Sequence, residues 1–234
     1  MSWPRHSLLL LLVMIPSRVI AMGEDDPLVG MLRFDKLEIA VDENPTPQRL
    51  EAKGWLGYDL NKLWLKSGVE REGGETDSAD LELLYGRAFA PYWDVQVGWK
   101  RDLKPSPEQD WLALGLHGLA PYFFEVDTTV YFADGGRSSL AFMAEYELLL
   151  TQRWILSPEF EFELNGYNER EMGIGSGLST LKVGLRLRYE IRREFAPYIG
   201  LHWERDYGNT ADFARSRGED VDDLQYVVGV RAWF

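Results

Sequence analysis

The feature that most constrains this chain is a period-two alternation of apolar and polar residues, which runs through most of the sequence. It is clearest at the end, where one phase holds Leu224, Tyr226, Val228, Val230, Ala232 and Phe234. The opposite phase of the same segment holds Asp223, Gln225, Gly229 and Arg231. Because successive side chains of a strand point to opposite faces, this pattern predicts a strand with one apolar and one polar face.

Strand-like segments of this kind recur along the chain, separated by turn-forming residues. We expect twelve, near residues 31–41, 50–59, 61–71, 76–89, 93–103, 110–118, 122–133, 138–149, 154–165, 178–192, 195–205 and 222–234. Segment 31–41 is the least regular, because Leu32 and Phe34 are out of phase with Leu37, Ile39 and Val41. The connections alternate between polar loops and short, aromatic-rich turns, which is typical of outer-membrane barrels.

The tripeptide Ala-Pro-Tyr occurs three times, at residues 90–92, 120–122 and 196–198, and we place all three in short turns. Proline suits a turn because it cannot donate a hydrogen bond to a strand ladder. The neighbouring tyrosine suits the membrane interface, where an aromatic ring can be partly apolar and partly hydrated.

These features together predict an all-β fold: an antiparallel transmembrane outer-membrane β-barrel of about 12 strands. Every strand offers an apolar face to lipid and a polar face to the lumen, and an even number of strands returns both termini to the periplasmic side. After the first residues, no apolar run approaches the roughly 20 residues that a spanning helix needs. A soluble lipocalin-like barrel or sandwich is the alternative, because alternation alone does not say which face meets water.

The first 21 residues have the features of an export signal. A basic start precedes an apolar run over residues 8–15 and a small-residue site that ends at Ala21, which predicts a signal peptide over 1–21, cleaved after Ala21. A signal anchor is the alternative. We expect residues 22–30 to be a short periplasmic segment and residues 31–234 to form the barrel, in the outer membrane of a Gram-negative cell. The final strand ending in Phe234 resembles the signal for barrel-assembly machinery, although a strand can also end in Phe by coincidence.

Charge and cysteine content exclude several classes of function. The formal net charge is −13, and removal of residues 1–21 makes it −15, because Arg5 and Arg18 are lost with no acidic residue. We therefore expect no nucleic-acid partner, since phosphates call for basic patches. The absence of Cys excludes disulfides, thiolate metal sites and Cys nucleophiles.

Five stretches of the chain resemble one known family, the copper resistance protein B family of outer-membrane proteins. They are residues 59–64 (DLNKLW), 118–124 (GLAPYFF), 144–153 (AEYELLLTQR), 173–178 (GIGSGL) and 187–198 (LRYEIRREFAPY). The resemblance covers residues 24–234 in the same order. It implies a barrel in outer-membrane lipid that serves copper resistance and homeostasis by binding or passing copper ions. It also implies a periplasmic multicopper oxidase as partner.

The chain departs from this family in one respect. Family members often carry an arm rich in Met and His before the barrel, and these residue types suit Cu(I). Between the expected cleavage site and the end of the first strand, this chain has only Met22 and Met31, and no His. The alternative function is therefore a small general outer-membrane channel without a metal-specific role.

Candidate metal ligands within the barrel are His117, His202, Met143, Glu145 and Glu147, all in the lumen phase. A His, a Met and carboxylates can form a copper site. His117 lies near the periplasmic end of its strand and His202 about seven residues into its own. At about 3.3 Å per residue, reduced by strand tilt, their heights differ by roughly 15 Å, so we do not expect one shared site.

The charged residues of the lumen also have a structural interpretation. Glu159, Glu161 and Glu163 precede Lys182, Arg186 and Arg188 by one loop. Antiparallel pairing predicts contacts between Glu163 and Lys182 and between Glu159 and Arg186, which would stabilise the barrel. The charged lumen residues thus have two interpretations, which are structural packing of this kind and an ion pathway.

An enzyme is the third class of function, since some twelve-stranded barrels are lipid hydrolases with an outward-facing Ser and His. That chemistry needs a His oriented beside a nucleophile. Both His117 and His202 face inward by phase, and neither has Ser as a close sequence neighbour. We therefore expect that the protein is not an enzyme.

Overall fold

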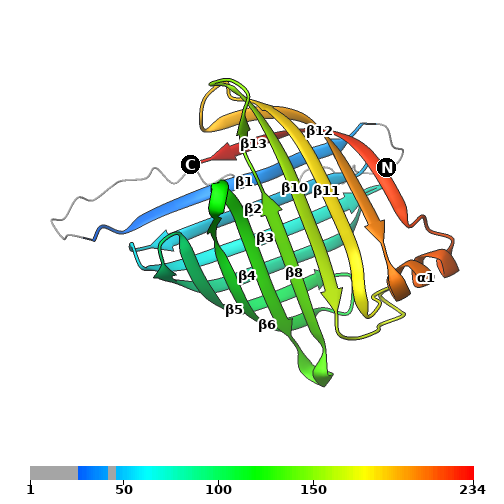
Figure 1. The fold of residues 1–234 in the computed structure, drawn as a ribbon. Coiled ribbons are helices and arrows are strands. Elements are labelled where there is room, and N and C mark those ends of the chain that lie inside the picture. The colour runs from blue at the N-terminus through cyan, green and yellow to red at the C-terminus, as the bar shows by residue number, and fades with distance from the viewer. Residues whose placement is uncertain (1–25, 42–45) are drawn as a thin grey trace, which may run out of the picture.

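The computed structural model describes residues 26–41 and 46–234, and these form a strongly tilted barrel of antiparallel strands (Figure 1). The expected signal peptide and residues 22–25 lie outside the described residues. The strands are β1 (Val29–Ala40), β2 (Gln48–Gly57), β3 (Asn61–Glu72), β4 (Glu75–Ala90), β5 (Trp93–Lys104), β6 (Gln109–Ala120), β7 (Phe124–Phe132), β8 (Ser138–Glu145), β9 (Leu148–Leu149), β10 (Trp154–Asn165), β11 (Gly177–Tyr189), β12 (Phe195–Asp206) and β13 (Asp222–Trp233). Three short helices connect some of them: η1 (Pro121–Phe123), η2 (Asp134–Gly136) and α1 (Gly208–Arg217).

The strands close into a ring. Neighbours in sequence pair antiparallel, and β1 pairs with β13 as well as with β2. The two-residue β9 pairs with β10, as β8 does, so β8 and β9 together form one interrupted strand. The ring therefore has twelve strand positions, and the expectation of a closed twelve-stranded antiparallel barrel is confirmed.

A β-bulge at Asp35 explains the irregular pattern of the first strand. Phe34 pairs with Ala52 of β2, whereas Lys36 pairs with Glu51, so Asp35 is the extra residue. Because a bulge adds one residue to one strand, it moves the alternation to the other phase. Leu32 before the bulge and Leu37 after it are consequently both exposed on the outside of the barrel.

The barrel has a polar interior and an apolar exterior. Buried side chains include Lys36, Glu38, Gln96 and Arg186, whereas large apolar side chains dominate the exposed positions of the strands. A water-soluble protein would bury the apolar phase instead. An outward-facing apolar band around a closed barrel is the surface that a lipid bilayer covers. Because the apolar phase of the alternation faces outward, a soluble lipocalin-like barrel or sandwich is excluded.

The two ends of the barrel differ. At one end, called the turn end here, lie the short connections around residues 58–60, 91–92, 121–123 and 190–194, together with the start of β1 and the end of β13. At the other, called the loop end, lie the short turn at residues 73–74 and several longer connections, of which residues 166–176 and 207–221 are the longest. In Figure 1 the turn end is on the left and α1 marks the loop end. No helix in the described part of the chain is both long and apolar enough to cross a membrane.

Two of the three Ala-Pro-Tyr tripeptides lie in turns as expected. Tyr92 and Tyr122 both have a φ of 67°, a left-handed conformation after a proline, and both are more than three-quarters exposed. The third placement was wrong. Ala196, Pro197 and Tyr198 lie within β12, and Tyr198 points into the lumen, where its hydroxyl donates a hydrogen bond of 3.0 Å to Glu38. Pro197 is tolerated because it lies near the start of β12, before the pairing of β12 with β11 begins at Tyr198.

Candidate functional site: the lumen

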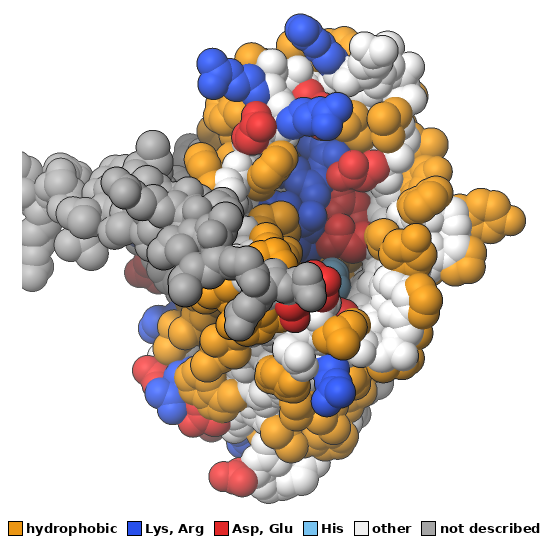
Figure 2. Space-filling model, turned by 90° about the vertical axis from the view of Figure 1, so that its left-hand side faces the viewer, with side chains coloured by type: hydrophobic (Ala, Val, Ile, Leu, Met, Phe, Trp, Pro, Cys, Tyr) orange, Lys and Arg blue, Asp and Glu red, His pale blue; other side chains and the backbone are white. Residues whose placement is uncertain are grey.

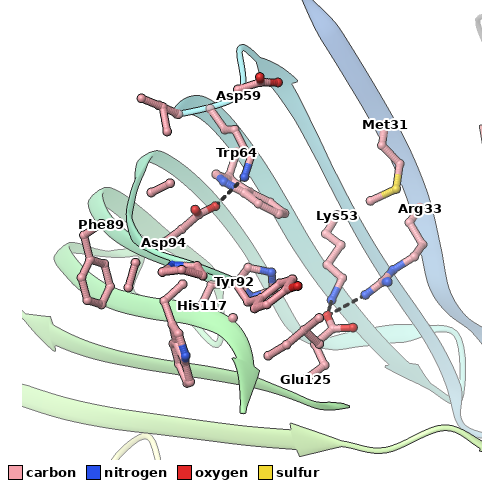
Figure 3. A pocket seen from close by; sticks show the side chains of 18 residues that line it. Met31, Arg33, Lys53, Asp59, Trp64, Phe89, Tyr92, Asp94, His117 and Glu125 are labelled. Atoms are coloured by element: carbon pink, nitrogen blue, oxygen red, sulfur yellow. Dashed lines mark hydrogen bonds and ion pairs between the residues drawn. The ribbon is translucent and has the colours of Figure 1, made fainter. Parts of the chain in front are cut away.

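A cavity of about 710 Å³ opens at the turn end of the barrel. Its lining combines apolar and aromatic residues such as Trp64 and Phe89 with the charged residues Arg33, Lys53 and Glu125. Figure 3 shows these side chains from close by, with Met31 and His117 on opposite sides of the opening. We call this space the turn-end cavity.

A second cavity of about 490 Å³ lies deeper in the lumen. The strands show that it is deeper. Arg33, Trp64 and Glu125 line the turn-end cavity, and the residues two positions further along the same strands, which are Asp35, Lys66 and Asp127, line the second cavity. Acidic residues outnumber basic residues in its lining by ten to four. The acids are Asp35, Glu51, Glu70, Asp80, Asp127, Glu145, Glu159, Glu161, Glu163 and Glu204, and the bases are Arg49, Lys53, Lys66 and Lys182. This central cavity therefore attracts cations.

An ion bridge crosses the barrel between the two cavities. Glu125 Oε1 on β7 accepts hydrogen bonds from Arg33 on β1, at 2.9 Å, and from Lys53 on β2, at 2.6 Å. β1 and β7 are six positions apart in the ring of twelve, so Arg33 and Glu125 reach each other from opposite sides. One layer deeper, Lys66 Nζ lies 2.5 Å from Asp127 Oδ2. We call the contact of Arg33 and Lys53 with Glu125 the Glu125 bridge; it narrows the path between the cavities.

Seen from the turn end, positive and negative side chains gather on different sides of the lumen (Figure 2). Figure 2 looks into the turn end and shows Lys and Arg gathered along one side of the hollow, with Asp and Glu along the other. Basic side chains of β1, β2, β11 and β13 contact carboxylates of β7, β8 and β10 there, in the pairs Arg33–Glu125, Lys53–Glu125, Arg186–Glu159 and Arg231–Glu145. Facing stripes of opposite charge produce an electric field across the lumen, which acts on any charged solute that enters.

His117 lies at the inner edge of the turn-end cavity. Its ring centroid is 4.9 Å from that of Trp64, in an edge-to-face arrangement, and its Nδ1 is 3.4 Å from Asp127 Oδ2. The Asp127 carboxylate is already held by Lys66. Met31 lines the same cavity, although on the opposite side of its mouth.

His202 lies in the middle of β12 with its side chain 3% exposed. Its Nε2 is 3.5 Å from Glu204 Oε2, and neither ring nitrogen has a hydrogen-bond partner. His202 and His117 thus have different acidic neighbours and lie on strands that are five positions apart. The expectation that both face the lumen is confirmed, and the structure brings them to separate places.

The other three candidate ligands also face the lumen, in different surroundings. Met143 lines the central cavity, where its thioether is near carboxylates. Arg231 and Arg188 both pair with Glu145 and Glu147, with the shortest distance, 2.7 Å, between Arg188 and Glu147. Because two guanidinium groups neutralise them, Glu145 and Glu147 are less available as metal ligands than their position in the sequence indicates.

One of the two ion pairs expected in the lumen was placed correctly. Arg186 donates a hydrogen bond of 2.9 Å to Glu159. Lys182, however, lies opposite Glu161 in the register, so its expected pairing with Glu163 was wrong by two residues. The register of β10 and β11 begins with Asn165 opposite Gly177, which the alternation does not specify, and the carboxylates closest to Lys182 are those of Glu204 and Glu70, from other strands.

In the described part of the chain, no group of three or more Asp, Glu or His side chains is arranged to hold a metal ion. The arrangement is instead one in which lysines and arginines occupy the spaces between carboxylates. Lys36 is the clearest case, because its Nζ is 2.9 Å from carboxylates of Glu51, Glu159 and Glu161. A cation that enters the lumen must compete with these side-chain cations.

Comparison with known proteins connects this lumen to a family. The family model described as copper resistance protein B precursor (CopB) matches residues 28–234, which is the whole barrel. The chain belongs to the copper resistance protein B family. Copper resistance protein B of Escherichia coli is 40% identical over 210 residues, which cover 90% of this chain and 71% of that protein. A copper resistance protein B homolog of Pseudomonas syringae pv. tomato (strain ATCC BAA-871 / DC3000) is 44% identical over 200 residues, or 86% of this chain and 68% of the homolog.

Among solved structures, the NanC porin is similar with a TM-score of 0.55 at 10% identity, covering 87% of this chain and 99% of the porin. At this identity the likeness concerns the fold alone. The porin-like barrel, its apolar exterior and the copper resistance protein B family together establish an outer-membrane β-barrel related to copper resistance.

Several lumen residues of this family member were not singled out from the sequence. Arg33, Lys53 and Glu125 lie far apart in the chain, and only the closed ring brings them together. The alternation does predict that these three side chains face the lumen. Which of the many inward-facing charges meet across the barrel depends on strand register and tilt, which a period of two does not specify.

Proposed function

We propose that this barrel serves copper resistance by admitting copper ions to its lumen, where they are bound in passing. The observation that supports this most is that the match to the copper resistance protein B family covers the barrel itself, residues 28–234. The lumen supports it as well, because the central cavity has an excess of carboxylates and contains Met143 in its lining. Carboxylate, imidazole and thioether groups are ligands for copper ions.

The path runs from the turn-end cavity, past the Glu125 bridge, into the central cavity. With both termini in the periplasm, the turn end faces the periplasm and the longer loops face outward. Copper is then a transported ion and not a resident cofactor. In this role the protein is not an enzyme: both described histidines face the lumen, away from the lipid substrates of a membrane hydrolase.

Two partners fit this role. A periplasmic multicopper oxidase, expected from the family resemblance, would exchange copper at the turn end. The barrel-assembly machinery would recognise the last strand, whose Phe234 is exposed on the outside and hydrogen-bonds through its backbone to Leu32 of β1.

A small general channel is the second candidate function. It is favoured by the ion pairs in the lumen, because Lys36, Lys66, Arg186 and Arg231 already neutralise many of the carboxylates. A lumen with segregated charges admits small polar solutes in general, without preference for a metal.

Deletion and complementation distinguish the two. A strain that lacks the gene and all paralogues should grow less well at elevated copper, and the wild-type gene should restore growth. In parallel, the purified barrel in vesicles that contain a copper-sensitive dye should admit copper faster than vesicles without protein. Unchanged copper tolerance of the deletion strain would refute the copper role, and equal permeability to copper, magnesium and a small sugar would favour the general channel.

A further inference from the structure

His202 has a buried imidazole whose nitrogens make no hydrogen bond, although a carboxylate is nearby. Its side chain is 3% exposed, and both Nδ1 and Nε2 lack a hydrogen-bond partner. Buried polar atoms in proteins are nearly always hydrogen-bonded, and an unsatisfied one points to a further group that completes it, such as an ion. The register explains why the strands on either side supply so little: His202 pairs with Gly184, which has no side chain, and with Gln225, whose amide contacts Arg49 and Asp223.

Glu204 lies at the edge of this imidazole and is linked through Lys182 to Glu70, whose Oε1 also accepts a hydrogen bond of 3.3 Å from Arg49. Glu204 Oε2 is 3.5 Å from His202 Nε2, and Lys182 Nζ is 3.3 Å from the same Oε2. Lys182 Nζ is also 3.6 Å from Glu70 Oε1, on β3 across the lumen. Glu204, Glu70 and Lys182 all line the central cavity, so a cation in that cavity can reach them.

Lys182 is held less closely than three other lysines of the lumen. Lys36, Lys53 and Lys66 each lie within 2.9 Å of a carboxylate, whereas both carboxylate contacts of Lys182 are longer than 3.2 Å. Lys182 also has another carboxylate within reach of a rotamer change, because Glu161 lies directly opposite it in the pairing of β10 with β11. Because the lysine stem is flexible, its ammonium can turn toward Glu161, which it would share with Lys36.

We propose that His202, Glu204 and Glu70 form a binding site for a divalent transition-metal cation, which enters by displacing the Lys182 ammonium toward Glu161. Two carboxylates balance the charge of a divalent ion, and the neutral imidazole supplies a nitrogen ligand. While Lys182 lies between the carboxylates, the ligands do not converge on one point, which agrees with the absence of a formed metal cluster in the described residues. Displacement of the ammonium is the step that lets them do so.

The ligand set selects among cations. Imidazole nitrogen with carboxylate oxygen suits Cu(II) and Zn(II), whereas Mg²⁺ prefers an all-oxygen octahedral shell, and Cu(I) prefers thioethers and thiolates. This site is a binding position inside the barrel along the proposed copper path, and Cu(II) is the ion that occupies it. The choice of copper over zinc rests on the proposed function, whereas the site itself rests on the geometry of His202.

The experiment titrates CuCl₂ into the full barrel, refolded in detergent micelles, by calorimetry and by electron paramagnetic resonance. We expect one Cu(II) site with nitrogen coordination, and no competition from an excess of MgCl₂. His202→Ala should weaken binding by at least about tenfold and remove the nitrogen signal. The matched control is His117→Ala, also a lumen histidine beside a carboxylate, which should bind like wild type. Lys182→Met should bind Cu(II) more tightly, because no ammonium has to be displaced.

Equal Cu(II) affinity of His202→Ala and wild type would overturn the proposal, as would a wild-type signal with oxygen ligands only. Loss of binding in His117→Ala but not in His202→Ala would place the site at the other histidine. If His202→Ala does not fold, as judged by its migration on unheated gels, the Cu(II) affinity of His202→Gln is measured in its place. The presence or absence of nitrogen coordination in the wild-type spectrum then tests the site without any variant. Growth of the deletion strain at high copper tests the proposed function separately, since it does not depend on where copper binds in the barrel.

Discussion

Arg186 on β11 donates two hydrogen bonds to the carboxylate of Glu38 on β1, at 3.0 and 3.1 Å, although 148 positions separate the two residues. The Glu38 side chain is 0% exposed and also accepts a hydrogen bond from Tyr198. Gly229 makes room for this arrangement, because a Cβ there would lie 2.6 Å from the Tyr198 hydroxyl. The pair links two strands that are three positions apart in the ring, so it fastens the barrel wall from within.

Replacing Arg186 by Met should therefore destabilise the barrel strongly. The substitution leaves Glu38 buried without its cation, and breaking a buried ion pair from one side costs about 3–5 kcal/mol. Urea unfolding in detergent micelles, followed by tryptophan fluorescence, measures the loss. The control is Arg205→Ala, which removes a pair with Asp222 that is nearly half exposed and should cost at most about 1 kcal/mol. Equal losses for the two variants would contradict the importance of the Glu38 pair.

Lys36 should be as sensitive as Arg186, for a related reason. Its ammonium is shared by Glu51, Glu159 and Glu161, all at 2.9 Å, and Lys36→Met leaves three carboxylates close together without it. We expect a loss of about 3–5 kcal/mol in free energy of unfolding. Adding Glu51→Gln and Glu161→Gln to the same variant should recover part of that loss, because the remaining repulsion is removed. No recovery in the triple variant would show that packing, and not charge, makes Lys36 necessary.

The barrel could be predicted from the sequence because period-two alternation is a local property. Leu224 and Gln225 show in adjacent positions which face meets lipid and which meets the lumen, and twelve such segments define a ring. Even the exception was informative: the phase change between Phe34 and Leu37 marks the bulge at Asp35. The alternation therefore gave the number of strands and the direction of nearly every side chain.

The contacts inside the ring could not be predicted in the same way. The sequence placed Lys182 beside Glu163, but the register of β10 and β11 puts Glu161 opposite Lys182, on the same face and two residues away. Likewise, Trp64 lies near a strand end, as an interfacial aromatic would, yet it faces inward and is 4% exposed. Contacts across the lumen depend on tilt, register and shear of the whole barrel, and none of these is encoded in a short stretch of residues.

The apolar outer surface leads to a prediction about lipid. Leu114 lies in the middle of β6 with its side chain exposed on the outside, whereas Leu224 is equally exposed but close to the loop end of β13. An arginine on the lipid face costs about 2–4 kcal/mol at the bilayer midplane and about 0–1 kcal/mol near an interface. Leu114→Arg should therefore lower the stability of the barrel in lipid vesicles much more than Leu224→Arg. Refolding titrations in urea measure both, and equal costs would contradict the membrane position given to β6.

The Glu125 bridge should control passage between the two cavities. Glu125→Ala removes the acceptor that Arg33 and Lys53 share, while Asp35 remains 2.6 Å from Arg33 and 3.5 Å from Lys53, so the barrel should still fold. We expect single-channel conductance in planar bilayers to rise several-fold, because the path past the bridge widens. The reversal potential in a salt gradient should shift toward anions, because the lumen loses a negative charge beside two positive ones. The matched control is Glu108→Ala, an exposed glutamate at the loop end, which should leave both quantities unchanged. Unaltered conductance of Glu125→Ala would mean that the passage is closed elsewhere in the lumen.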